Sequence, residues 1–188
     1  MALLPILVAP DPRLKKKSTP VKVVDDGVRR LLDDMLETMR AAPGIGLAAP
    51  QVNVHKRIVV MEIEREGVST GPLFLINPEI VEVSDEDATY NEGCLSVPEH
   101  YADVSRPARV TVRHLDRDGV QRDMACDGLL ATCVQHEMDH LDGILFIDKI
   151  SALKRGIILR KLVKARKDAE RDGADKKKAK ADASAAMS

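Results

Sequence analysis

Apolar residues recur every three or four positions in the segment that begins at Asp25, and this is the spacing of one buried helix face. The face consists of Val28, Leu31, Leu32, Met35, Leu36 and Met39. Asp25 or Asp26 is suited to capping the start of such a helix, and Pro43 followed by Gly44 is suited to ending it. We therefore predict a first helix between these two signals.

The same spacing, in a less regular form, predicts two further helices. One runs from about residue 128 to residue 141, with Asp127 as its candidate cap and Gly143 just beyond its end. The other covers residues 153–163, where apolar residues fall at partly helical spacing. Residues 1–24, by contrast, are punctuated by prolines and are expected to be extended.

Strands are predicted between the first two helices. Short apolar runs occur at residues 57–63, 73–76 and 80–83. Apolar and polar residues alternate along residues 108–115, as in a strand. Residues 116–119 are suited to a turn and residues 120–125 to a returning strand, so we predict a hairpin. A helix, then strands, then helices within one chain indicates a single α+β domain with antiparallel or mixed sheets.

The composition fits one such domain. With 188 residues the chain is long enough to bury a core, and this core must be aliphatic because there is no Trp and only two Tyr and two Phe. So few aromatic residues argue against a surface that stacks nucleic-acid bases. Three cysteines, an odd number, do not suggest a disulfide framework. The N-terminal apolar run precedes its basic residues, unlike a signal peptide, and no run reaches the roughly 18–20 apolar residues of a membrane span.

The net charge of −1 conceals an uneven distribution. Residues 149–180 contain 13 Lys and Arg against 4 Asp and Glu, whereas the rest of the chain contains 16 against 26. After about Arg166 the apolar residues are nearly all alanine, which cannot bury enough surface to fold alone. We therefore predict a folded domain over residues 1–166 and a basic, disordered tail over residues 167–188.

The strongest chemical signal is HEMDH at residues 136–140. On a helix, His136 and His140 project from one face and can bind one metal ion. Glu137 is rotated from His136 by about 100°, so it is better placed to contact a water at the ion than to be a third ligand. The alternative is two hydrated histidines on an amphipathic helix. The apolar residues just before the motif weaken that alternative, because they indicate a buried helix.

A catalytic metal site needs a third protein ligand. Downstream of His140 the chain has no histidine, and its only glutamate, Glu170, lies in the basic tail. Upstream it offers Cys94, although a cysteine taken alone is more often a small core residue than a ligand. The same holds more strongly for Cys126 and Cys133. The residues alone therefore leave the third ligand open.

Three separated segments resemble the motifs of the peptide deformylase family. They are GIGLAAPQ at residues 44–51, EGCLS at residues 92–96 and QHEMDHLDG at residues 135–143. PDPRL at residues 10–14 is similar to the start of the family as well. The similarity extends over roughly residues 5–160, and three motifs in the right order favour this family over a chance match.

The resemblance implies an enzyme that removes the N-formyl group from the initiator methionine of nascent polypeptides and releases formate. The metal ligands it implies are Cys94, His136 and His140, on and beside a central metal-binding helix. The ion would be Fe²⁺, one per chain, with Ni²⁺, Co²⁺ or Zn²⁺ as substitutes. Glu137 would act as general base and then as general acid. Gln51 and the backbone N–H of Leu95 would stabilise the developing oxyanion.

The same motifs give candidate contacts with the substrate. They are Gly44, Ile45, Gly46, Glu92, Thr132 and Cys133. The two glycines would let a peptide approach closely for strand-like pairing. Tyr101 stands where several family members carry arginine, which leaves one substrate contact open. Arg106 would either hydrogen-bond the ligand loop or be a surface charge.

The expected partners follow from the resemblance. They are formylated nascent peptides and, through the basic tail, ribosomal RNA, although the tail could equally be a solvated end. We expect a monomer in the bacterial cytoplasm without DNA or membrane partners. An organellar origin stays open, because a cleaved transit peptide would leave no trace.

Two other functions compete with deformylation. A peptidase with the His-Glu-x-x-His motif would cleave internal bonds of unblocked peptides, but the candidate third ligand here is an upstream cysteine. A non-catalytic ribosome binder would have no need to keep Glu137, Gln51 and all the ligands together. Both are therefore less favoured.

Overall fold

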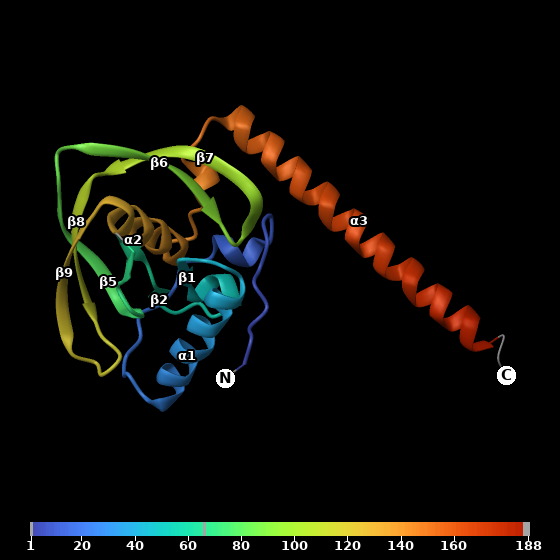
Figure 1. Cartoon of the computed structure of the whole chain (residues 1–188), viewed down its shortest axis with the longest axis horizontal. Coiled ribbons are helices and arrows are strands. Elements are labelled where there is room, and N and C mark those ends of the chain that lie inside the picture. Colours follow the sequence, from blue (N-terminus) through green and yellow to red (C-terminus); the bar gives the residue numbers. More distant parts are fainter. Residues whose placement is uncertain (1, 66, 186–188) are drawn as a thin grey trace.

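An antiparallel sheet of five strands has a helix packed on each of its faces (Figure 1). The computed structural model describes residues 2–65 and 67–185, and within them the side chains of residues 2–64 and 67–171. In order across the sheet, the strands are β1 Gly46–Ala48, β2 Ile58–Met61, β5 Leu73–Val83, β8 Arg109–Leu115 and β9 Gln121–Asp127. Outside this sheet, β6 Asp87–Cys94 pairs with β7 Val97–Pro107, and β3 Glu64–Arg65 pairs with β4 Val68–Ser69. The predicted α+β fold is confirmed.

Helix α2 (Gly128–Leu141) lies between the five-stranded sheet and the β6–β7 hairpin (Figure 1). It packs its apolar residues against the inner face of the sheet. The buried cluster includes Ala131, Val134, Met138 and Leu141 from α2 with Val59, Met61 and Val112 from the sheet. A helix covered on both sides can hold polar side chains away from water, and this is what places the histidines of α2 inside the molecule.

Helix α1 (Asp26–Ala41) covers the opposite face of the sheet. Because successive side chains of a strand point to opposite faces, Ile58 and Val60 of β2 pack on the α1 side while Val59 faces α2. The side chain of Asp25 accepts a hydrogen bond from the backbone N–H of Val28 at 2.9 Å. The predicted helix and its cap are therefore confirmed.

Strand β5 corrects the prediction of two strands at residues 73–76 and 80–83. The structure has one strand whose register shifts between Ile76 and Glu79. At this bulge, Asn77 has a positive φ of 52°, and its side chain forms two 2.8 Å hydrogen bonds with the backbone of Val21. The polar bulge interrupts the apolar pattern but does not break the strand.

The β6–β7 hairpin was not predicted from the apolar pattern. Ala102 and Val104 of β7 point inward, and the next inward residue is Arg106, which is buried. On β6, the buried residue is Glu92. Charged residues therefore occupy positions where an alternating pattern would require apolar ones, and this hides the strands.

Helix α3 (Ala152–Ala185) begins against the body of the molecule and then extends away from it (Figure 1). Its first turns bury Ile158 and Leu162 beside Phe146, which lies in the short helix η3 (Phe146–Asp148). The helix continues into residues 167–185, for which the sequence predicts disorder. Alanine, lysine and arginine all have high helix propensity, which accounts for helical backbone there. The boundary at residue 166 stays a prediction. In the part of the chain that the structure describes, no helix is long and apolar enough to cross a membrane.

Candidate metal centre

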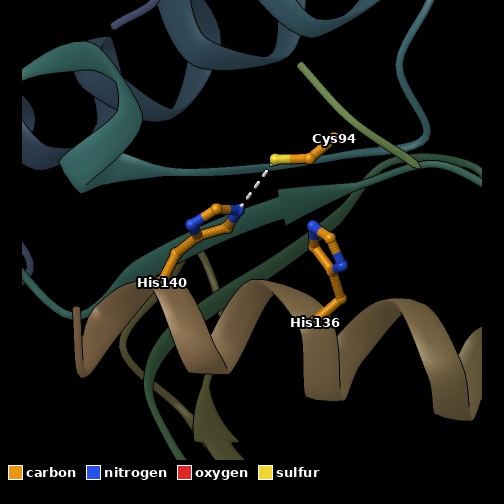
Figure 2. A group of neighbouring side chains, drawn as sticks. All are labelled: Cys94, His136 and His140. Carbon is orange, nitrogen blue, oxygen red and sulfur yellow. Dashed lines mark hydrogen bonds between the residues drawn. The ribbon is translucent and has the colours of Figure 1, made fainter. Parts of the chain in front are cut away.

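Cys94, His136 and His140 converge on one point between the β6–β7 hairpin and helix α2 (Figure 2). Their ligand atoms all lie within 4.8 Å of one another, and Cys94 Sγ is 3.2 Å from His140 Nε2. Cys94 is the last residue of β6, and the two histidines lie one turn apart on the same face of α2. The structure therefore brings together the three ligands that the sequence motifs indicate.

The donor set fits a single divalent metal ion. His136 Nδ1 lies 2.8 Å from Glu92 Oε2, which leaves Nε2 to face the cluster. Metal-binding histidines usually donate the other ring N–H to such a carboxylate. Burial lowers the pKa of His140 well below its usual range, which favours the neutral ring that binds a metal. Burial also lowers the pKa of His136, but its contacts with Cys94 and Glu92 outweigh burial and raise it. One thiol and two imidazoles suit Fe²⁺, Ni²⁺, Co²⁺ and Zn²⁺.

A buried ion-pair network supports this cluster from behind. The Arg106 guanidinium donates to both oxygens of Glu92 at 2.6 and 2.9 Å and to Asp139 Oδ2 at 2.7 Å. Burial alone would raise the pKa of Glu92, but its bonds with Arg106 and His136 hold the pKa below its usual value. Glu92 is therefore a carboxylate that orients His136. The sequence suggested a bond from Arg106 to the ligand loop, but it gave no sign of the contact with Asp139.

We expect Arg106→Ala to destabilise the protein by about 3–5 kcal/mol, because it leaves the buried carboxylate of Glu92 without its cation, whereas Asp139 keeps its ion pair with Lys149. Urea unfolding of the metal-free protein measures this effect. Arg113→Ala is the matched control, since Arg113 makes an equally two-pronged bond with Asp123 that faces water. The control should lose far less stability. Equal losses in the two variants would contradict a special role for the buried pair.

Glu137 lies beside the ligands and packs against strand β1. A Cβ atom at Gly46 would lie 2.5 Å from Glu137 Oε1, so only glycine leaves room for this carboxyl group. Its other oxygen, Oε2, is buried without a hydrogen-bond partner among the described residues. Burial raises the pKa of Glu137 to about 7, against the lowering effect of His136 and Arg106. A carboxyl group poised near neutrality can both accept and give a proton.

Gln51 is held in one orientation next to the cluster. It lies in the short helix η2 (Ala49–Val52), and its Oε1 accepts a hydrogen bond from the backbone of Ala48 at 2.7 Å. Its Nε2 donates to Ser96 Oγ at 3.1 Å and lies 3.6 Å from Cys94 Sγ. Because the oxygen is already used, the N–H₂ group faces the metal centre. Sequence reasoning missed Ser96, although it lies within the EGCLS segment.

A groove of about 570 Å³ leads to these residues. Its lining includes Gly44, Ile45, Gly46, Gln51, Cys94, Leu95, Tyr101, His136 and Glu137. This volume suits a ligand of a few residues. Glu92, Thr132 and Cys133, which were also expected to contact the substrate, are buried and are not among the lining residues. Cys133 Sγ lies behind Gly46, and contact of these three residues with a substrate stays a prediction.

Comparisons with known proteins agree with one another. The family model described as polypeptide deformylase matches residues 3–156. The peptide deformylase of Rhizobium meliloti (strain 1021) is 53% identical over 167 residues, which cover 89% of this chain and 96% of that relative. The peptide deformylase of Zymomonas mobilis (strain ZM4) is 56% identical, with 89% and 97% covered. The crystal structure of the peptide deformylase from Ehrlichia chaffeensis matches with a TM-score of 0.87 at 42% identity, and the match covers 89% of this chain and 99% of that one. The crystal structure of its complex with actinonin matches with a TM-score of 0.85 at 45% identity, covering 88% of this chain and 98% of that one.

Proposed function

The chain belongs to the peptide deformylase family, enzymes that remove the N-formyl group from the N-terminal methionine of new polypeptides, and we propose that the groove beside Cys94, His136 and His140 is where it does so. The observation that carries this proposal is the convergence of the three ligand atoms at a groove that also contains Glu137. The reaction adds water to the formyl carbon and breaks its bond to nitrogen. Formate and a free α-amine are released.

Fe²⁺ is the ion we assign to this site, one per chain, with Ni²⁺, Co²⁺ or Zn²⁺ as substitutes. When bound, it supplies Lewis acidity, which makes water a nucleophile near neutral pH. Cys94 binds as the thiolate, and the two histidines bind as neutral rings. Glu92 and Arg106 keep His136 in the orientation that binding requires.

The proton transfers belong to Glu137. Its unpartnered Oε2 takes a proton from the attacking water as the water adds to the formyl carbon. The same carboxyl group then gives that proton to the departing nitrogen. Negative charge that develops on the formyl oxygen is met by Gln51 Nε2 and the backbone N–H of Leu95. Since Gln51 is already oriented by its bonds with Ala48 and Ser96, its donor needs no rearrangement.

The substrate backbone pairs with the segment Gly44–Ile45–Gly46. This segment lines the groove, and without side chains at its two glycines it permits close approach of an extended peptide. We place the methionine side chain toward Thr132 and Cys133, behind Gly46, with Glu92 nearby. Gly44 is constrained on the same wall, since a Cβ atom there would lie 2.7 Å from Leu95 Cδ1.

The enzyme assay that tests this proposal uses protein purified without oxygen. Formyl-Met-Ala-Ser should release formate, its unformylated twin should stay intact, and chelation should abolish turnover until Fe²⁺ or Ni²⁺ is added. Metal content is measured on the same samples. An enzyme that holds one ion per chain yet releases no formate, or that cleaves internal bonds of the unformylated peptide, would contradict the proposal.

We propose that the basic C-terminal segment binds ribosomal RNA near the emerging nascent chain, in the cytoplasm of a bacterial cell. Deletion of residues 167–188 should leave turnover of formyl-Met-Ala-Ser unchanged, because the groove lies in the body of the molecule. The deletion should weaken binding to ribosomes, and binding of the full-length monomer should fall steeply with salt. Sedimentation with ribosomes at several salt concentrations measures both. If the truncated and full-length proteins bound ribosomes equally well, the tail would have no role in ribosome binding.

A further inference from the structure

A second hollow of about 300 Å³ adjoins the catalytic groove. One wall is formed by the β6–β7 hairpin, with Asn91, Tyr101, Ala102 and Asp103. The other is formed by Ile150, just before α3, and by Lys154, Ile157 and Ile158 in the first turns of α3. The polar groups of the first wall already bond with each other, since Asn91 Nδ2 donates to Asp103 Oδ1 at 2.8 Å. Apart from these two residues and Lys154, the lining is apolar and consists of Tyr101, Ala102, Ile150, Ile157 and Ile158.

Tyr101 connects this hollow to the catalytic groove, because it lines both. Its ring lies directly on Gly93, the residue before the metal ligand Cys94. A Cβ atom at Gly93 would lie 2.5 Å from Tyr101 Cε1, so the glycine is what allows the ring to lie flat on β6. The side chain nevertheless remains 68% exposed. Tyr101 thus presents a fixed apolar surface where the two hollows meet.

Helix α3 extends this apolar surface. Leu153 is 73% exposed and Ile157, one turn later on the same face, is 39% exposed. The first turns of α3 also bury Ile158, which lines the hollow, and Leu162 against the body. An exposed apolar strip beside a binding groove indicates an interaction site.

We propose that this hollow is a subsite for an apolar side chain of the polypeptide substrate, several residues downstream of the formylmethionine. The inference rests on the proposed function. A nascent chain bound by its N-terminus at the metal centre must leave the groove, and Tyr101 borders both the groove and this hollow. An extended chain advances roughly 3.3 Å per residue, so a few residues suffice to pass the tyrosine ring. The apolar strip on α3 then meets a side chain of the passing substrate.

The test uses formylated nonapeptides in which a single leucine moves from position 3 to position 9 of a serine- and alanine-based sequence. The kcat/KM for formate release is measured for each peptide. In the natural enzyme, leucine at one or two adjacent positions should raise kcat/KM roughly three- to tenfold through KM, as expected for partial burial of one leucine. Leu153→Asp and Ile157→Asp should remove this gain. Turnover of formyl-Met-Ala-Ser, which is too short to reach the hollow, should not change in either variant.

Val120→Asp is the matched control, since Val120 is 47% exposed in the turn between β8 and β9, away from α3 (Figure 1). It should keep the leucine gain. The proposal is overturned if no leucine position raises kcat/KM, or if the gain survives Leu153→Asp and Ile157→Asp. It is also overturned if these variants instead change the sedimentation of the free enzyme, because the strip would then join two copies of the chain. Failure of the natural enzyme to deformylate the tripeptide would refute the proposed function instead.

Discussion

Glu137→Gln should retain one divalent ion per chain while lowering kcat for formyl-Met-Ala-Ser by about 10²- to 10⁴-fold. The amide has nearly the same shape as the carboxyl group, so it fits the space that Gly46 leaves open. It cannot accept a proton from water, however, and this removes the transfer that starts the reaction. The three ligands are untouched, so metal content should stay at the level of the natural enzyme.

The measurement combines steady-state kinetics with metal analysis of the same preparation. Glu86→Gln is a suitable control, because Glu86 is an exposed residue paired with Arg109 and stands outside the groove. Its kinetics should match those of the natural enzyme. Retained turnover in Glu137→Gln would assign the proton transfers to another group. Loss of the ion together with turnover would make Glu137 a ligand, against the geometry described above.

Cys94→Ser should weaken metal binding by more than about 100-fold, a larger loss than the ten- to hundredfold typical of residues that only support a ligand. A thiol is deprotonated by the ion that it binds. A serine hydroxyl is a harder donor that holds its proton more strongly, so it cannot replace the thiolate. Activity at limiting Fe²⁺ should fall in parallel.

Cys126→Ala separates this effect from the general loss of a thiol. Cys126 is buried on β9, where burial raises the pKa of its thiol to about 11, and among the described residues it does not belong to the metal-ligand group. This variant should keep both its ion and its activity. Titration with a chromophoric metal indicator gives the affinities. If Cys94→Ser bound Fe²⁺ as tightly as Cys126→Ala does, Cys94 would be a core residue and the third ligand would have to be sought elsewhere.

The sequence predicted those parts of the molecule whose signals are local. Helix α2 follows from its apolar spacing, and the pairing of His136 with His140 follows from helix geometry alone. Asp25, the cap of α1, accepts its hydrogen bond from the backbone N–H of Val28, only three residues later. Each of these depends on residues within one or two turns, which a linear pattern contains.

The parts that were not predicted depend on contacts between distant segments. The β6–β7 hairpin buries Glu92 and Arg106, which form an ion pair across the two strands. Each of these charged residues taken alone would be predicted to be exposed to solvent, because the sequence does not show that they pair. Asp139 lies inside the HEMDH motif, yet nothing in the motif shows that it binds Arg106. For the same reason, the bond from Gln51 to Ser96 became visible only in three dimensions. Cys94 was assigned through a family resemblance, since spacing alone left it open.

The separation of 46 residues between Cys94 and His140 has a consequence for folding. In the unfolded chain, a loop of this length must close before thiol and imidazole can share an ion, and closure costs entropy that grows with loop length. In the native fold, the end of β6 and helix α2 have already closed it. An ion held by these residues would therefore bind the native state in preference to the unfolded chain, and the free energy of unfolding should rise as the concentration of the ion rises above its Kd. A metal ion at this site would thus also act as a reversible cross-link between the β6–β7 hairpin and the core.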